Sequence, residues 1–415
     1  MVKKTKINKY LSFFIALILI ISIAPVAQAT EDFQYVNELK NYIIGNPADG
    51  DIYFEHNAVE PTAIASITKL MTYYVVMDDI TDQKYDLTDI VTIDEEAASY
   101  AAPGNSHMGL KVNEQVSVED LLKGILVVSA NDGAVALAKH SAGSQAAFAN
   151  LMNTKAKELG LETADFINPT GLSVYDNNLV GQERLDNAQY SKLSLRDLFK
   201  LTSHIVETYP EIYDITSLDQ LILPDRNYVG NISHTMFQDI PSLVGLKSGM
   251  TYEAGYAFDG IVDMSKVNPE QNYNLVIIFT GAANAEARIE SMKELINYAS
   301  NNLNFRDLVN YEAGIAVTDY YSSQTLEKSI PLYVNEGIYK IVGNNVNRTV
   351  QIDLTPGLEA PFEDGQVMGE MTVFLDGNEA GKVDLINKGY KAKLGFMNAL
   401  IESAKDFINS IMLLF

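Results

Sequence analysis

Three short polar motifs follow one another along this chain of 415 residues. They are Ser66-Ile67-Thr68-Lys69, Ser129-Ala130-Asn131 and Lys247-Ser248-Gly249. Each pattern carries little information alone. Together, in this order and each in a suitable local context, they predict one reaction class. In that class a serine attacks an amide carbonyl, and a lysine instead of a histidine handles the proton.

The first motif is expected at the start of an amphipathic helix. A helix start offers free backbone N–H groups and a positive dipole end to an oxyanion that develops at Ser66. Lys69, three residues on, shares a helix face with Ser66. Apolar neighbours and other cations can keep such a lysine neutral, so that it can act as a base. The helical spacing is carried by Leu70, Met71, Tyr74 and Val75.

The second motif lies between two apolar stretches, residues 121–128 and 134–138. Ser129 and Asn131 therefore occupy a polar break between two core elements. Two roles are open for them: they cap the neighbouring helix, or they face a cleft where they relay protons and bind a substrate amide. The presence of Ser66 and Lys69 favours the cleft.

The third motif ends an apolar run, residues 243–246, and precedes the segment 250–258. This pattern predicts a strand, a turn and a second strand. Lys247 and Ser248 are then expected to protrude from a sheet edge that can bind an extended peptide. A lysine and a hydroxyl together suit a substrate that ends in a free carboxylate.

Beyond the motifs, long stretches of the chain resemble the D-alanyl-D-alanine carboxypeptidases, which are low-molecular-mass penicillin-binding proteins. The resemblance covers nearly all of the chain after residue 29. It implies removal of the terminal D-alanine from peptidoglycan pentapeptide stems through an acyl-enzyme, and covalent binding of β-lactam antibiotics. The similar stretches are residues 66–72, 120–122, 129–132, 152–153, 159–161, 166–172, 193–198, 245–249, 358–362 and 364–369.

The resemblance implies a role for each residue of the first two motifs. Ser66 is the nucleophile, and Lys69 is its base. Ser129 relays a proton toward the leaving amine, and Asn131 binds the backbone amide of the substrate.

The resemblance also assigns the third motif and the residue after it. Lys247 and Ser248 hold the terminal carboxylate, while Gly249 and Met250 complete the substrate-binding segment. The oxyanion hole is formed by the backbone N–H groups of Ser66 and Met250. The family usually has Thr at position 248 and His or Thr at position 250. Serine keeps the hydroxyl and a backbone N–H survives any side-chain change, so we expect altered positioning, rate or specificity within the same reaction class.

Residues 1–29 have the pattern of a cleaved secretory signal. Four lysines precede an apolar run from Leu11 to Ile23, and Ala27-Gln28-Ala29 offers a cleavage site. The alternative to a cleaved signal is a retained membrane-spanning anchor, but Pro25 ends the apolar segment too early for that. The protein is therefore expected to be exported and to act at the outer face of the cytoplasmic membrane or in the cell wall space.

Charge and composition exclude several partners. The formal net charge is −24, which repels nucleic acid and anionic lipid head groups. The absence of cysteine excludes a disulfide scaffold and a thiolate metal site. The five histidines show no metal-binding spacing. We expect no nucleic acid partner, no metal and no cofactor.

Strands at both ends of residues 30–305, with helices between them, predict an α+β fold. The pattern indicates a hairpin within residues 41–55, strands near 243–247, 255–262 and 275–280, and a closing helix over 285–298. The resemblance specifies this as the penicillin-binding and serine β-lactamase-like transpeptidase domain, an antiparallel sheet with helices.

The remaining chain divides into a small all-β domain, residues 306–390, and a tail, residues 391–415. Short strands are predicted at 315–318, 330–334, 339–342, 349–354, 369–375 and 382–385, between Gly, Asn and Pro turns. In the tail, apolar residues from Leu394 to Ile411 recur at helical spacing. This helix is too short and too polar to span a bilayer. It either docks on its own domain or lies in the plane of a membrane surface, and the apolar end, residues 412–415, favours the membrane.

Three rival functions share the motifs or the fold. A class A β-lactamase needs an E-x-x-L-N segment, which this sequence lacks. A catalytically silent wall-binding protein is disfavoured because all the motif residues are intact. A DD-endopeptidase uses the same site, and the sequence does not separate it from a carboxypeptidase.

Overall fold

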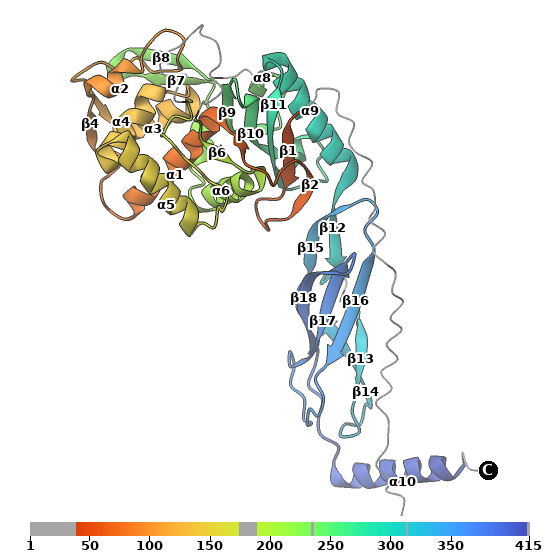
Figure 1. Cartoon of the computed structure of the whole chain (residues 1–415). Helices are drawn as coiled ribbons and strands as arrows, with labels where there is room; N and C mark the ends of the chain where they lie inside the picture. The colour runs from red at the N-terminus through yellow and green to blue at the C-terminus, as the bar shows by residue number, and fades with distance from the viewer. Residues whose placement is uncertain (1–38, 174–188, 234–235, 313, 413–415) are drawn as a thin grey trace, which may run out of the picture. The chain divides into compact units, whose positions relative to one another are not determined.

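Figure 1 shows the chain in a computed structural model, which describes residues 39–173, 189–233, 236–312 and 314–412. The predicted signal segment, residues 1–29, lies outside the described residues.

A five-stranded antiparallel sheet forms the centre of the first part. Its strand β11 is a nearly continuous run of buried apolar residues, which is typical of a strand covered on both faces. Because β1 pairs with β11, the two ends of this part share one sheet. The strand order is β2 (Ile52–His56), β1 (Asn41–Gly45), β11 (Asn274–Ala282), β10 (Gly255–Asp263) and β9 (Leu243–Thr251).

The third motif lies inside β9 instead of at its end, so this part of the prediction was wrong. The ladder between β9 and β10 continues until Thr251 opposite Gly255, because only three residues form the turn. Lys247 and Ser248 therefore project from the body of a strand. As β9 is at the edge of its sheet, the motif still lies on an edge, as predicted.

Helices α6 (Leu195–Thr208) and α9 (Ala285–Asn302) cover opposite faces of this sheet (Figure 1). Asp259 on β10 is bonded to Thr202 of α6, whereas a Cβ on the next residue, Gly260, would touch Met292 of α9. Successive residues of a strand face opposite sides, so the two helices lie on different faces. The predicted closing helix is α9, four residues longer than expected.

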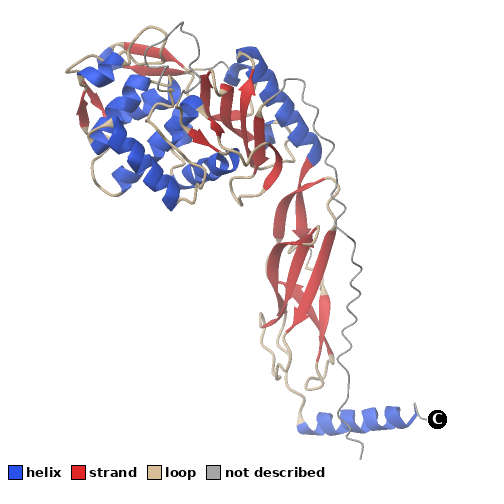
Figure 2. Cartoon of the chain, viewed as in Figure 1, coloured by secondary structure: helices blue, strands red, loops and turns tan. Residues whose placement is uncertain are grey.

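A second group of helices surrounds α1 (Thr68–Thr81), and Figure 2 shows this group beside the sheet. Eleven of its fourteen residues are buried. The prediction of an amphipathic helix was therefore wrong: α1 is a central helix that packs against several others, and it has no broad solvent face. The other helices of this part are α2 (Glu95–Ser99), α3 (Val118–Val127), α4 (Asn131–Ala142), α5 (Gln145–Glu158), α7 (Ile212–Thr216) and α8 (Met236–Asp239).

Within the described residues of the first part, three two-stranded ribbons accompany the main sheet. They pair β3 (Thr62–Ala63) with β6 (Lys192–Leu193), β4 (Ile90–Thr92) with β5 (Gln115–Ser117), and β7 (Gln220–Leu223) with β8 (Tyr228–Asn231).

The second part is all-β, as predicted, around a separate core that includes Phe362, Ile330 and Leu385. The sequence missed its first strand, β12 (Leu303–Val309), which follows α9 directly and pairs with β15 (Ile338–Gly343). The strand expected at 315–318 starts only at residue 318, because the apolar residues before it are exposed. The main sheet has the order β13 (Thr318–Tyr321), β14 (Ser329–Val334), β18 (Asn378–Asn387), β17 (Val367–Leu375) and β16 (Arg348–Leu354).

The tail forms the helix α10 (Phe396–Met412), as predicted. Several large apolar side chains are exposed along it: Phe396, Met397, Leu400, Ile401, Phe407 and Ile408. Among the described residues, no helix combines the length and the apolar character needed to cross a membrane.

Candidate active site

The candidate nucleophile, Ser66, lies in a single 3₁₀ turn, η1 (Ala65–Ile67), directly before α1. Its two neighbours in the turn are buried, whereas Ser66 is only partly buried, so its hydroxyl can reach the surface. Ala65 has a φ of +49°, a left-handed conformation that a non-glycine residue adopts only when the surroundings enforce it. The strained turn therefore holds the hydroxyl in a defined position.

Lys69 occupies the first turn of α1, one helical turn after Ser66. Its Nζ is 3.1 Å from Ser66 Oγ, and it donates hydrogen bonds to Asn131 Oδ1 and to the Thr170 carbonyl, each at 2.7 Å. The lysine is completely buried. All three contacts lie on the nitrogen that the sequence assigned as the base.

Burial holds the pKa of Lys69 well below its ordinary value, because the charged form loses its hydration. The nearby Lys247 lowers the pKa further by charge repulsion, and the carboxylate of Asp132 acts in the opposite direction. Asp132 is itself buried and accepts hydrogen bonds from the backbone N–H groups of Met108 and Leu110. The net result is a pKa of Lys69 well below that of an ordinary lysine.

The second motif connects α3 to α4. The N-cap of α4 is Ala130, which has no capping side chain, so neither Ser129 nor Asn131 caps this helix. Asn131 instead places its side-chain oxygen on Lys69. Ser129 has a φ of +59°, and its hydroxyl has no hydrogen-bond partner among the described residues. The strained backbone at Ser129 again marks a position that the fold imposes.

The third motif presents its groups from β9. Lys247 is completely buried, and its Nζ donates to the carbonyl of Ser248. Burial, followed by repulsion from Arg288, lowers the pKa of Lys247 to about 7. The Ser248 hydroxyl lies 2.9 Å from the Ser233 hydroxyl.

Gly249 and Met250 lie next along β9. A Cβ on Gly249 would lie 2.9 Å from the Ile64 carbonyl oxygen and 3.1 Å from Ala65 Cβ, so only glycine lets β9 come this close to η1. The side chain of Met250 is exposed.

A further segment, residues 168–171, belongs to the site but was missed as a functional element. The carbonyl of Thr170 accepts a hydrogen bond from Lys69. Asn168 fixes the loop by accepting from the backbone N–H groups of Thr170 and Gly171. Sequence reasoning identified these residues only by resemblance, because their contribution to Lys69 is a backbone carbonyl, which no side-chain pattern reveals.

The structure thus places Ser66 and Asn131 each in contact with Lys69, with Lys247 close enough to affect the Lys69 pKa. No hydrogen bond joins Ser129 or Lys247 to Ser66 among the residues that the structure describes.

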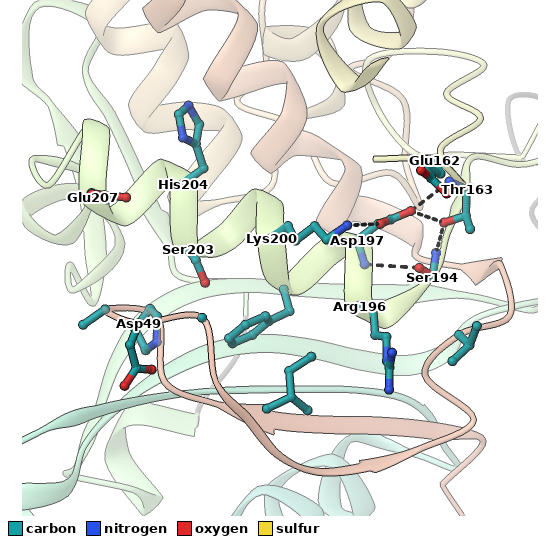
Figure 3. Close-up of a pocket in the computed structure, with 16 residues that line it drawn as sticks. Asp49, Glu162, Thr163, Ser194, Arg196, Asp197, Lys200, Ser203, His204 and Glu207 are labelled. Carbon is teal, nitrogen blue, oxygen red and sulfur yellow. Dashed lines mark hydrogen bonds and ion pairs between the residues drawn. The ribbon is translucent and has the colours of Figure 1, made fainter. Parts of the chain in front are cut away.

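A cavity of about 620 Å³ lies elsewhere, along α6 and the β1–β2 turn (Figure 3). No motif residue lines it. Its two cations are already compensated, because Arg196 is paired with Glu55 and Lys200 with Asp197. The cavity is therefore distinct from the candidate active site.

Two family models match the chain. Residues 28–278 match the D-alanyl-D-alanine carboxypeptidase model, and residues 310–390 match the C-terminal domain of penicillin-binding protein 5. The chain is 29% identical to the D-alanyl-D-alanine carboxypeptidase DacA of Haemophilus influenzae, with 93% of each chain covered. It is 26% identical to the D-alanyl-D-alanine carboxypeptidase DacF of Bacillus subtilis, with 96% of this chain and 99% of the relative covered.

Solved structures agree with this assignment. Penicillin binding protein 5 from Haemophilus influenzae has a TM-score of 0.63 at 26% identity, over 86% of this chain and 98% of that one. Penicillin-binding protein D2 from Listeria monocytogenes, in its ampicillin-bound form, has a TM-score of 0.52 at 25% identity, over 62% and 96% of the two chains. The match over more than half of the sequence, on a fold that assembles the motifs, shows that this chain belongs to the D-alanyl-D-alanine carboxypeptidase family.

Proposed function

We propose that Ser66 is the nucleophile of this serine carboxypeptidase and that Lys69 is the base that activates it. The observation that carries the proposal is the 3.1 Å separation between Ser66 Oγ and a fully buried lysine nitrogen. A neutral amine has two N–H donors and one lone pair. With the donors directed at Asn131 and Thr170, the lone pair is left to face the Ser66 hydroxyl.

The reaction then follows as an acyl transfer. Ser66 Oγ attacks the carbonyl carbon of the penultimate D-alanine, while its proton passes to Lys69 Nζ. The C–N bond breaks, and the leaving amine of the terminal D-alanine takes up a proton, for which Ser129 is the relay. Water then adds to the ester and releases the shortened peptide, which restores the Ser66 hydroxyl.

Three further groups orient the substrate. Asn131 keeps its side-chain N–H₂ free to donate to a substrate carbonyl, since its oxygen is held by Lys69. Lys247 and Ser248 hold the terminal carboxylate of the substrate. A carboxylate favours the protonated form of Lys247, so binding and protonation support each other.

The oxyanion hole consists of the backbone N–H groups of Ser66 and Met250. The close approach of Gly249 to Ile64 and Ala65 supports this role, because it brings the end of β9 beside η1. Donors held in place before the reaction need no reorganisation when charge develops on the carbonyl oxygen.

The proposed substrate is a peptidoglycan stem pentapeptide ending in D-Ala-D-Ala, and β-lactams are covalent inhibitors that acylate Ser66. The ampicillin-bound relative of the same fold supports the second part. The catalytic domain is assigned to residues 30–305 and the β-rich domain to residues 306–390.

Product analysis tests this function. Mass spectrometry of a muramyl pentapeptide treated with the protein should show loss of one D-alanine, and Ser66→Ala should show none. Cleavage of cross-linked peptide dimers as the preferred reaction would identify a DD-endopeptidase instead. Rapid turnover of penicillin would identify a β-lactamase. Binding of the protein to the cell wall without any change in the peptide would identify a silent binding protein.

We also infer that the protein is exported, with residues 1–29 as the signal, and that α10 binds a membrane surface in its plane. The exposed apolar side chains of α10 support the second inference, because such a face is unfavourable in water.

A further inference from the structure

Two serine hydroxyls face each other at the proposed carboxylate subsite. The Oγ atoms of Ser233 and Ser248 are 2.9 Å apart, which is a hydrogen-bonding distance. Ser248 belongs to the third motif and is buried, whereas Ser233 lies shortly after β8 ends and is partly buried. Ser233 belongs to none of the three motifs, and only the fold brings it beside one of them.

The backbone of Ser233 is fixed to the end of α3. Its N–H donates to the carbonyl of Val127, the last residue of that helix, at 3.0 Å. The last carbonyls of a helix have no partner within the helix, so this bond satisfies one of them. A Cβ on Gly230 would lie 2.6 Å from Val128 Cγ1, so β8 also comes close to the same helix end. Because Ser129 follows directly after this end, Ser233 links the segment of the second motif to the strand of the third.

The side chain of Ser248 does not fix the direction of its own hydroxyl. A serine hydroxyl has three staggered positions about χ1, whereas the second branch of a threonine restricts this angle. The family usually has threonine at position 248. The cross-strand partner of Ser248 is Phe258, whose side chain has no polar atom that could hold the hydroxyl. Among the residues that the structure describes, the side-chain group bonded to this hydroxyl is that of Ser233.

The direction of this hydrogen bond follows from the number of hydrogens. A hydroxyl has one hydrogen to donate, and a carboxylate only accepts. If Ser248 donates its hydrogen to the substrate carboxylate, Ser233 must donate to Ser248 Oγ. The two hydroxyls and the carboxylate then form one chain, in which each hydrogen bond polarises the next. Without Ser233, the Ser248 hydroxyl would be free to turn away from the carboxylate.

We propose that Ser233 is a positioning residue of the carboxylate subsite, which orients the Ser248 hydroxyl in place of the methyl group that a threonine would supply. The proposal rests on the carboxylate subsite described under the proposed function. Ser233 acts through Ser248, away from the bond that breaks. This role differs from the simple pairing of two hydroxyls, because a threonine at position 248 should make Ser233 dispensable.

The test is a double-mutant cycle in the full mature chain, with an acylated D-Ala-D-Ala peptide and its C-terminal amide as substrates. Ser233→Ala should lower kcat/KM for the free acid about five-fold, mainly through KM, because it removes one hydrogen bond. The same change should lower kcat/KM for the amide by less than about two-fold, because a neutral acceptor forms a weaker hydrogen bond than a carboxylate.

The second arm of the cycle restores the methyl group. In a Ser248→Thr background, Ser233→Ala should lower kcat/KM for the free acid by less than about two-fold, because the threonine restricts its own χ1. Ser233→Thr keeps a hydroxyl donor and should keep the preference for the free acid. Ser265→Ala is the matched control: Ser265 is also partly buried and donates to a side chain, Asp263, but it lies in η3 (Met264–Lys266), after β10 ends. The control should leave kcat/KM for both substrates unchanged.

Three outcomes would each overturn the proposal: an equal loss on acid and amide, no loss at all, or the same loss in the Ser248→Thr background as in the wild type. If Ser248→Thr alone lowers activity, the ratio of the double variant to Ser248→Thr still measures the coupling. A wild type that prefers the free acid, together with no effect of Ser233→Ala, would refute this inference and leave the proposed function standing. If the wild type treats acid and amide alike, the carboxylate subsite itself is wrong, and the role of Ser233 is refuted with it.

Discussion

Substituting Gly171 by alanine should disable the active site through the backbone alone. Gly171 has a φ of +77°, and a Cβ there would lie 1.9 Å from the Ala65 carbonyl oxygen and 2.7 Å from Thr68 Oγ1. The left-handed conformation costs an alanine about 1–2 kcal/mol. The overlap adds to this, because either the loop or η1 must move by roughly 1.5 Å to reach an ordinary contact distance of about 3.5 Å. A displacement of that size at a reacting group can reduce the rate by about 100-fold.

The assay measures kcat/KM on a D-Ala-D-Ala peptide, the rate of acylation by a labelled penicillin, and thermal stability. Gly143→Ala is the matched control: its φ is +78°, but nothing lies within 4 Å of the added Cβ. We expect the control to lose about 1–2 kcal/mol of stability with activity retained. If Gly171→Ala retains acylation within about three-fold of the wild type while its stability falls no more than that of the control, the loop does not position the nucleophile.

Three further outcomes are expected. Ser66→Ala should remove covalent penicillin labelling with the fold intact, and labelling that persists would refute the nucleophile. Lys247→Met should lower kcat/KM by roughly 10- to 100-fold, yet stabilise the protein at pH 7 by roughly 1–4 kcal/mol. The sign of this stability change follows from the Lys247 pKa of about 7, because the unfolded chain binds a proton on this lysine that the folded chain binds only weakly. This gain should vanish as the pH rises toward 10.5, and a loss of stability at pH 7 would contradict it. A chain ending at Gly389 should stay soluble and active and should not sediment with liposomes, whereas the mature chain should do so even in high salt; equal partitioning would show that α10 docks on protein.

Much of the fold was available from local patterns. The hairpin of β1 and β2, the strands β10 and β11, the helix α9 and most strands of the second domain are encoded by periodicity and turn residues that act over a few positions. The central helix α1 was misjudged as amphipathic, because a helix surrounded by others buries its polar positions as well. The strand β12 was missed for a related reason, since its middle residues are exposed and give no apolar run.

The sequence by itself determined the reaction class, because Ser66, Lys69, Asn131 and Lys247 carry their chemistry in their side chains. Only the tertiary structure decided the burial, the contacts and the pKa shifts of those side chains. The lowered pKa of Lys69 depends on its burial and on the charge of Lys247, which is 178 residues away in the sequence. Electrostatic effects fall with distance in space and not with separation along the chain, so they become visible only when the fold is known.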